Sequence, residues 1–326
     1  DVVGRDGERG GDLQQKGFSQ YAIWSLVRCA RHENPDRSLR MVDLNDGSLD
    51  VPGLTRALAL SGEPEVALRD DELWVPRLRR EHASDEREAS SPELSEGTVL
   101  ITGAARGIGL ELVRQLAPTD CRILATCRNL DRAEDLRQIA EAHPGIEVLM
   151  LDVEDEASVL ELARRLDGES IDVLYNNAGI IDWRTMLEVD AASMEQVYKV
   201  NVVGVMLVLR SFLGHLKRAT APLVVNLSSR LGSIALRGRT QLGGAIAYSA
   251  SKAALNMLTK QASIDLADDG ISVVSISPGW VRTDMGGADA KYSVEESVER
   301  ILRNVKNFSA EDTGKFFGED GQELPF

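Results

Sequence analysis

The sequence predicts an α/β protein built on a doubly wound parallel sheet, with a smaller α/β unit in front of it. Over the last two thirds of the chain, apolar segments alternate with amphipathic ones, a pattern typical of parallel strands joined by helices. A glycine-rich segment, Gly103 to Gly109, follows the first of these apolar segments. In doubly wound folds the first strand-to-helix turn has this composition. Both observations favour a sheet covered by helices on its two faces.

Six apolar segments of this part have strand character: residues 98–103, 121–127, 146–153, 171–179, 222–229 and 271–279. Their apolar residues run consecutively, as expected of strands that are buried on both faces. Amphipathic segments such as GLELVRQLA and DLRQIAEAH lie between them and predict helices.

A composition break at residues 81–96, EHASDEREASSPELSE, divides the chain. The segment is charged and rich in serine, which is typical of a linker. We therefore expect a first domain at residues 1–80 and a main domain at residues 97–326.

The first 80 residues carry mixed short patterns. Helical patterns lie at residues 17–33 and 51–60, a strand pattern at residues 39–44, and two strand patterns around an acidic turn within residues 66–78. None of these segments has a glycine-rich phosphate loop or a catalytic cluster. This part is expected to be a small α/β subdomain without a cofactor.

Composition excludes several classes of function. The 326 residues have a formal net charge of −15 and are 43% hydrophobic, so we expect neither nucleic acid nor an anionic membrane as a partner. No apolar stretch is long enough for a membrane helix and the chain starts with no signal peptide, so we expect a cytoplasmic protein. Neither the three cysteines nor the four histidines are spaced as metal ligands.

The glycine-rich turn predicts a dinucleotide site. Glycines allow the backbone to approach a pyrophosphate, and the amides at the start of the following helix favour its negative charge. Cys127 ends the second strand, where proteins that prefer NAD carry an acidic residue for the ribose. Arg106 and Arg128 instead favour a 2′-phosphate, hence NADPH. The alternative is that both arginines are solvated surface residues.

Tyr248 and Lys252 lie four residues apart in the segment AYSASKAALN. Residues at this spacing share one face of a helix, so the pair alone could be an ordinary neighbour contact. Catalytic meaning depends on the motifs that accompany it.

Those motifs carry a resemblance to the short-chain dehydrogenase/reductase family. TGAARGIG, LDV, NNAG, Asn201, NLSSRLGS, Tyr248-x-x-x-Lys252 and PGWVRT occur in the family's order over residues 97–326. The end of the chain is most similar to the carbonyl-reductase branch that includes the C-factor and sniffer proteins. The resemblance implies a Rossmann-like sheet of seven parallel strands.

The resemblance implies a catalytic group of four residues. Tyr248 donates a proton to a carbonyl, with its phenol pKa lowered toward neutrality by Lys252, which also holds the nicotinamide ribose. Ser229 hydrogen-bonds the carbonyl, with Ser228 as the nearest alternative. Asn201 anchors a water that returns the proton.

The same resemblance implies a cofactor site made by residues that follow the strands. Besides Tyr248 and Lys252, these are Thr102, Gly103, Arg106, Gly107, Ile108, Gly109, Arg128, Asp152, Val153, Asn176, Ala178, Gly179, Pro278, Gly279, Val281 and Thr283. Asn176 or its neighbour Asn177 could instead be only a strand-end cap. Residues Asp284 to Glu296 are expected to form a lid.

The front segment resembles the structural subdomain of modular polyketide synthase ketoreductases, a truncated Rossmann-like fold. This implies a substrate bound to an acyl carrier protein and neighbouring polyketide synthase domains. Those ketoreductases have Asn and Lys at the positions of Lys252 and Asn201, so the catalytic half belongs to another branch. Their stereochemical markers do not transfer either, since Thr240 replaces one and Ile181 to Trp183 keep only Asp182 of the other.

Three functions remain open at this point. The first is an NADPH-dependent ketoreductase acting on a carrier-bound β-ketoacyl thioester. The second is a reductase of small diffusible ketones or aldehydes, and the third is a non-enzymatic nucleotide-binding signalling protein. Trp183 could shape the substrate pocket or only cover the sheet edge. The insert of 18 residues between Ser229 and Tyr248 could shape the pocket mouth. The oligomeric state, the chain length of the substrate and the product stereochemistry are not predicted.

Overall fold

The computed structural model describes residues 97–238 and 243–326, and in the N-terminal part residues 41–44, 55–56, 59, 65–69 and 72–74. The chain divides into two compact units, Asp1–Asp85 and Glu86–Phe326. The predicted helix at residues 17–33 and the predicted linker at residues 81–96 lie outside the described residues.

In the first unit, three strands form a small sheet. β1 (Met41–Leu44) pairs in parallel with β2 (Glu65–Arg69), and β2 pairs antiparallel with β3 (Glu72–Trp74). The three strands predicted in this segment are therefore present. Of the helix predicted at residues 51–60, residues 55–56 and 59 are helical.

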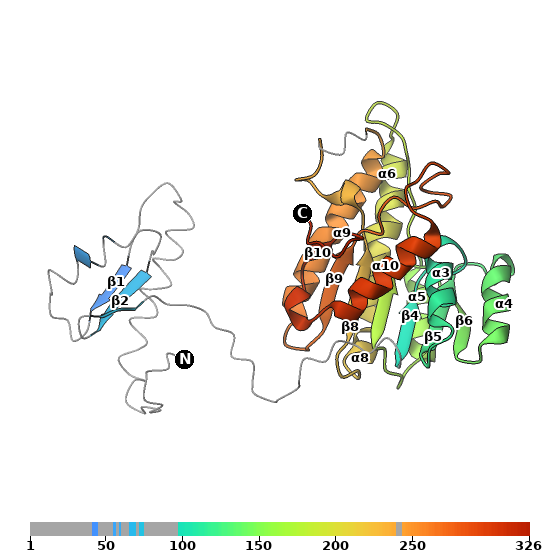
Figure 1. Ribbon diagram of the computed structural model, residues 1–326, viewed down its shortest axis with the longest axis horizontal. Coiled ribbons are helices and arrows are strands. Elements are labelled where there is room, and N and C mark those ends of the chain that lie inside the picture. The colour runs from blue at the N-terminus through green and yellow to red at the C-terminus, as the bar shows by residue number, and fades with distance from the viewer. Residues whose placement is uncertain are drawn as a thin grey trace. The chain divides into compact units, whose positions relative to one another are not determined.

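The second unit is built on a sheet of seven parallel strands, which confirms the predicted fold (Figure 1). The strand order is β10-β9-β8-β7-β4-β5-β6. The strands are β4 (Thr98–Ile101), β5 (Arg122–Cys127), β6 (Ile146–Met150), β7 (Val173–Asn176), β8 (Leu223–Leu227), β9 (Ser272–Ile276) and β10 (Phe316–Phe317). The order reverses on either side of β4, so a crevice opens at the carboxyl ends of β4 and β7.

Helices cover both faces of this sheet (Figure 1). On one face lie α3 (Gly107–Leu116), α4 (Glu134–Ala142) and α10 (Val294–Asn307). On the other lie α5 (Glu156–Arg165), α7 (Val205–Ser211), α8 (Leu213–Leu216) and α9 (Ile246–Asp265). The shorter elements are α6 (Ala191–Tyr198), the π-helix η2 (Lys199–Gly204) and the 3₁₀ turns η1 (Leu130–Arg132), η3 (Arg230–Gly232) and η4 (Ala310–Asp312).

The central strand β4 explains why the strand segments are apolar throughout. Val99 and Ile101 pack into the core on the side of α3 and α10, whereas Leu100 packs into the core on the side of α5 and α7. All three side chains are at most 1% exposed. Successive residues of a strand face opposite sides, so burial on both faces requires an apolar residue at each position.

Among the described residues, the observed strands are shorter than the predicted segments. β6 ends at Met150 and β7 at Asn176, so Asp152, Val153 and residues 177–179 lie in loops beyond the carboxyl edge. The seventh strand, β10, has two residues and pairs with β9. Two residues are too few for a strand pattern to be recognised in the sequence.

None of the described helices is both long and apolar enough to cross a membrane.

Candidate active site

The sheet brings Tyr248, Lys252, Ser229 and Asn201 together from three segments at its carboxyl edge. Tyr248 and Lys252 lie one turn apart near the start of α9, and Ser229 is the N-cap of η3, directly after β8. The Tyr248 hydroxyl is hydrogen-bonded to Ser229. The Lys252 Nζ atom lies 5.6 Å from the centroid of the Tyr248 ring. The helical pair predicted from the sequence thus has a third partner within contact distance.

The structure distinguishes Ser229 from Ser228. The Ser228 side chain is buried and donates its hydroxyl to Asn256 Oδ1 at 2.6 Å, away from the site. Ser229 is half-buried, and its Oγ atom accepts a hydrogen bond from the Leu231 amide at 3.2 Å. Since Ser229 also meets the Tyr248 hydroxyl, it is the serine that can reach a bound carbonyl.

Asn201 lies in the π-helix η2, and its side chain contacts the loop that follows β7. A π-helix has a wider turn than an α-helix. Its Nδ2 atom donates to the Ile180 carbonyl at 2.9 Å and to Ser251 Oγ at 3.0 Å. Its Oδ1 atom accepts from the Ile180 amide at 2.9 Å. Asn201 therefore fixes Ile180 against α9, and the predicted role in anchoring a water stays a prediction.

Burial raises the pKa of Tyr248 and lowers the pKa of Lys252. It raises the pKa of Tyr248 to about 12, although the hydrogen bond from Ser229 lowers it in part. It lowers the pKa of Lys252 to about 8, while Lys252 Nζ donates to the Leu227 carbonyl at 2.6 Å. In this structure the expected lowering of the phenol pKa is wrong, because loss of hydration outweighs the hydrogen bond. A phenol that stays protonated at neutral pH is the form that can donate a proton.

The glycine-rich turn fits a bound pyrophosphate. Gly103 and Gly107 have φ values of +69° and +55°, which favour glycine. A Cβ atom on Gly109 would lie 2.4 Å from the Gly103 carbonyl oxygen, so the turn excludes a side chain there. The amides of residues 107–109 precede the first intrahelical bond of α3 and have no acceptor among the described residues. These amides can bind an anion.

A threonine and an asparagine hold this turn to the next strand. Thr102 Oγ1 accepts hydrogen bonds from the amides of Asn177 and Ala178, both at 3.0 Å. Asn177 Nδ2 donates to the carbonyls of Thr102 and Gly103 at 2.9 and 3.0 Å. A strand-end cap was one of the roles left open for Asn177; in the structure its side chain supports the glycine-rich turn. In the sequence, the signal for this role was the position of Asn177 directly after Asn176 at the end of a strand segment.

Asn176 does not line the crevice with its side chain. The residue is 2% exposed, and its Nδ2 atom donates to Asn226 Oδ1 of β8 at 2.8 Å. Gly179 lies closer to the site, since a Cβ atom there would be 3.2 Å from Asn201 Oδ1 and 3.8 Å from Lys252 Nζ. In the NNAG motif, Asn176 thus holds β7 to β8 by a side-chain hydrogen bond. Gly179 has no side chain to fill the space beside Asn201 and Lys252.

The two arginines expected to bind a 2′-phosphate both face carboxylates. Arg128 Nη1 donates to Glu154 Oε2 at 3.2 Å, and Arg106 pairs with Asp284. Their side chains are 69% and 70% exposed. Both guanidinium groups are thus accessible to a phosphate that competes with the carboxylates, although Glu154 itself is only 15% exposed. Asp152 lies nearby, where its Oδ1 atom accepts from the Glu154 amide at 3.0 Å.

The loop after β9 reaches the glycine-rich turn from the other side. A Cβ atom on Gly107 would lie 3.6 Å from Thr283 Cγ2 and meet nothing else within 4 Å. Pro278 is held by Ser297, whose Oγ atom donates to its carbonyl at 2.8 Å. Gly279, with φ of +82°, lies against the ring of Tyr292. Ile108, at the start of α3, packs against the core. The remaining predicted position, Val153, lies against Gly204 of η2.

Of the segment Asp284–Glu296, predicted to form a lid, the last residues belong to the start of α10, and the lid role stays a prediction. Ser293 Oγ accepts from the Glu296 amide at 3.1 Å and Glu296 Oε2 accepts from the Ser293 amide at 2.8 Å, a capping box that starts α10. The remaining loop is closed at its base by a bridge between Val281 and Tyr292. We refer to it as the 281–292 loop.

The residues at the positions of the polyketide ketoreductase markers, which do not transfer to this chain, have other partners here. Asp182 accepts hydrogen bonds from Arg184 and Ser193, which hold its pKa well below its usual range. Trp183 is 47% exposed, and its carbonyl accepts from the Ala245 amide at the start of α9 at 3.2 Å. An indole exposed to this extent agrees with either predicted role, shaping the substrate pocket or covering the sheet edge. Thr240 lies outside the described residues.

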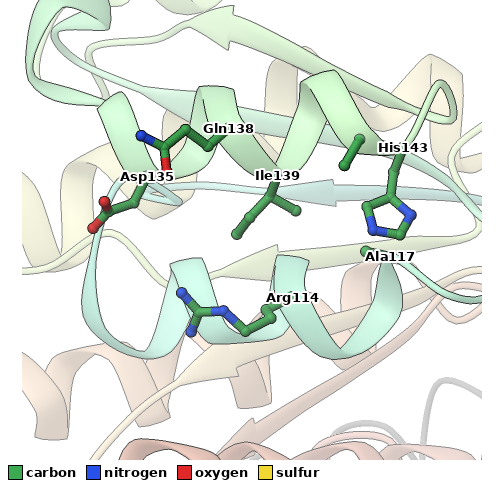
Figure 2. A pocket seen from close by; sticks show the side chains of 7 residues that line it. Arg114, Ala117, Asp135, Gln138, Ile139 and His143 are labelled. Atoms are coloured by element: carbon green, nitrogen blue, oxygen red, sulfur yellow. The ribbon is translucent and has the colours of Figure 1, made fainter.

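A groove lies between α3 and α4 (Figure 2). Its volume is about 420 Å³, and it is lined by Arg114, Ala117, Asp135, Gln138, Ile139, Ala142 and His143. None of these residues belongs to the predicted site. Within the described residues, no cluster of three or more His, Cys, Asp or Glu side chains is arranged to hold a metal ion.

Comparison with known proteins agrees with this geometry. The family model "short chain dehydrogenase" matches residues 97–292, and the model "Polyketide synthase extender module SpnB, Rossmann fold domain" matches residues 3–78. An uncharacterized oxidoreductase of Schizosaccharomyces pombe is 34% identical over 250 residues, which cover 69% of this chain and 96% of the relative. The C-signal protein of Myxococcus xanthus is 40% identical over 157 residues, which cover 48% of this chain and 93% of the relative.

Solved structures give the same result. The NADPH-bound carbonyl reductase from chicken fatty liver is 37% identical, with a TM-score of 0.67 over 70% of this chain and 98% of its own. The carbonyl reductase Sniffer of Drosophila melanogaster is 31% identical, with a TM-score of 0.66 over 71% of this chain and 99% of its own. Relatives that align along nearly their whole length, and a family model that spans most of the catalytic half, establish that the chain belongs to the short-chain dehydrogenase/reductase family of oxidoreductases.

Proposed function

We propose that the protein is an NADPH-dependent ketoreductase that reduces a β-ketoacyl thioester, carried on an acyl carrier protein, to the β-hydroxyacyl thioester. One observation supports this choice among the family's activities: residues 3–78 match a domain of a polyketide synthase module on the same chain as a reductase half. Its partners are then other polyketide synthase domains, and its reaction takes place in the cytoplasm.

The residues at the crevice have complementary roles in this reaction. When bound, the dinucleotide supplies a hydride to the carbonyl carbon. Tyr248 holds a proton on its hydroxyl at neutral pH and donates it to the carbonyl oxygen as negative charge develops there. Ser229, next to that hydroxyl, donates a hydrogen bond to the same oxygen. The ammonium group of Lys252 stabilises the phenolate that remains until a solvent proton restores it.

The residues around the glycine-rich turn bind the cofactor. The free amides at residues 107–109 receive the pyrophosphate, and Thr283 faces them across the gap. Arg106 and Arg128 bind the 2′-phosphate of NADPH by exchanging their carboxylate partners for it. Two similar structures support this preference, a carbonyl reductase named as NADPH-bound and a putative short-chain dehydrogenase/reductase of Burkholderia multivorans named with bound NADP.

A second function, reduction of small diffusible ketones or aldehydes, is supported by the carbonyl reductases among the similar structures. Both functions use the same residues and differ in how the carbonyl arrives. A non-enzymatic signalling role would have no need for the complete group of Asn201, Ser229, Tyr248 and Lys252.

A substrate panel separates the two functions. The full-length protein is given NADPH with a β-ketoacyl group on an acyl carrier protein, the same acyl group on N-acetylcysteamine, and simple ketones and aldehydes. We expect the highest kcat/KM for the carrier-bound thioester, with the β-hydroxyacyl product identified by mass spectrometry. Equal kcat/KM values for thioesters and simple carbonyls would support the second function. No NADPH consumption with any of them would contradict both.

Arg128→Ala tests the assignment of the 2′-phosphate site. Because charge-assisted hydrogen bonds to phosphate are strong, we expect the Kd for NADPH to rise about 10-fold while the Kd for NADH changes little. Binding is followed by the fluorescence of the reduced nicotinamide. Arg164→Ala, which removes an exposed arginine of α5 paired with Glu161, is the matched control and should change neither Kd. An equal loss for both cofactors would contradict the assignment.

A further inference from the structure

A buried carboxylate, Glu319, pairs with the one-third exposed guanidinium of Arg230 directly beside the proposed catalytic serine. Arg230, the residue after Ser229, donates from Nε at 3.1 Å and from Nη2 at 3.0 Å to Glu319 Oε2. Glu319 belongs to the segment that follows β10, and it is 8% exposed. A carboxylate so poorly hydrated needs its cationic partner, because removing one member of a buried pair leaves an uncompensated charge.

The backbone of both partners is adapted to this contact. A Cβ atom on Gly318 would lie 2.6 Å from Arg230 Nη2, so a side chain there would displace the guanidinium. Asn304 of α10 donates to the carbonyls of Gly318 and Glu319, both at 3.3 Å. These bonds hold the segment that follows β10 against α10. The Arg230 amide donates to Ser277 Oγ at 3.3 Å. The pair is thus set between rigid elements.

The same carboxylate reaches the 281–292 loop. The Tyr292 hydroxyl donates to Glu319 Oε1 at 3.4 Å, and the carboxylate stem of Glu319 lies beside Gly279. Tyr292 closes the base of the loop, since its amide donates to the Trp280 carbonyl at 3.0 Å and its carbonyl accepts from the Arg282 amide at 2.9 Å. One buried carboxylate therefore contacts the serine turn and the loop that carries Thr283.

We propose that Glu319 is a positioning residue of the reductase: through Arg230 and Tyr292 it holds the Ser229 turn after β8 and the 281–292 loop after β9 in a fixed relation to each other. Ser229 caps η3, and η3 begins with Arg230, so a shift of the guanidinium moves the turn that orients the serine hydroxyl. Displacement of catalytic groups by about 1 Å can cost about 100-fold in rate. The proposal rests on the proposed function, since it assumes that Ser229 contacts the reacting carbonyl.

Glu319→Gln is the principal test, because it removes the charge and keeps the shape. With NADPH and the N-acetylcysteamine thioester of acetoacetate, we expect kcat/KM to fall about 10- to 100-fold, mainly through kcat, with a smaller loss of affinity for NADPH. Tyr292→Phe, which removes only the long hydrogen bond, should lower it about threefold. Glu169→Gln is the matched control: Glu169 accepts from Arg122 at 2.6 Å at the opposite, amino end of the strands, and its loss should not affect kcat/KM.

A double-mutant cycle with Ser229→Ala shows whether Glu319 acts through the serine. If it does, Glu319→Gln has little further effect once the serine hydroxyl is gone. Full additivity of the two losses would overturn the proposal. If Ser229→Ala alone retained full activity, the proposed function of Ser229 would fail instead, so the two failures are distinguishable.

Hydrogen exchange of the free protein gives a readout that needs no activity. In Glu319→Gln we expect faster amide exchange in peptides covering residues 229–236 and 280–293, and no change with Glu169→Gln. Faster exchange confined to the segment around residue 319, or to only one of the two peptides, would overturn the proposal even if no substrate were reduced.

Discussion

Replacing Tyr248 with phenylalanine is expected to lower kcat about 100- to 10,000-fold, the usual contribution of a general acid. The substitution removes only the hydroxyl that is bonded to Ser229, and the ring keeps its place near Lys252. Burial raises the pKa of this phenol to about 12, so the wild-type hydroxyl holds its proton at neutral pH. The measurement is single-turnover oxidation of NADPH with the acetoacetyl thioester.

Binding separates loss of the acid from loss of the site. The Kd for NADPH should change less than threefold in Tyr248→Phe, because the phosphate-binding amides lie on α3. Tyr198→Phe is the matched control, since Tyr198 lies on α6 and is 46% exposed, and it should retain wild-type kcat. A Tyr248→Phe protein with more than about one tenth of the wild-type kcat would contradict the assignment of Tyr248 as the proton donor.

The sequence predicts the catalytic half well because its local signals agree with its global fold. Apolar runs, glycines with positive φ and polar residues just beyond the strands all mark the same carboxyl edge of one sheet. The four proposed catalytic residues come from the resemblance to the short-chain dehydrogenase/reductase family, and the structure brings them to the same edge of the sheet. Their chemical roles stay predictions.

What sequence patterns did not reveal depends on contacts between distant segments. Glu319 lies 89 positions from its partner Arg230, and no local periodicity relates them. The two residues of β10 form a strand only because β9 offers them an edge. The pKa of Tyr248 likewise depends on how completely the folded chain removes water from the phenol, which spacing alone cannot show.

Replacing Lys252 with methionine is expected to lower kcat about 100- to 1,000-fold, as for loss of one preorganised electrostatic group, and yet to stabilise the fold. Lys252 is 5% exposed, and burial lowers its pKa to about 8. The folded protein therefore holds a charged lysine at pH 7 at a cost of free energy. Methionine has a similar length and no charge, but it leaves the Leu227 carbonyl without the lysine's hydrogen bond. We expect a net gain of about 1–2 kcal/mol in the free energy of unfolding at pH 7.

The pH dependence of that gain gives the sharper test. Below pH 8 both the folded and the unfolded wild-type chains carry the lysine proton, so the full cost of burial is present. Between pH 8 and the ordinary lysine value of 10.5, the unfolded chain binds more protons than the folded one, and wild-type stability rises with pH relative to the variant. The advantage of Lys252→Met should therefore be constant below pH 8 and disappear by about pH 10.5.

Urea unfolding at pH 7 and pH 10, with Lys260→Met as control, measures this difference. Lys260 is an exposed residue of the same helix, so its replacement should change stability little and equally at both pH values. A Lys252→Met protein that is less stable than wild type at pH 7 would show that the ammonium is compensated by its surroundings. Lys252 would then stabilise the fold, and its charge would not be a cost that the fold bears in order to stabilise the Tyr248 phenolate. The opposite effects on rate and stability are expected because a site that stabilises a transient negative charge must hold a positive one in the folded protein before the reaction begins.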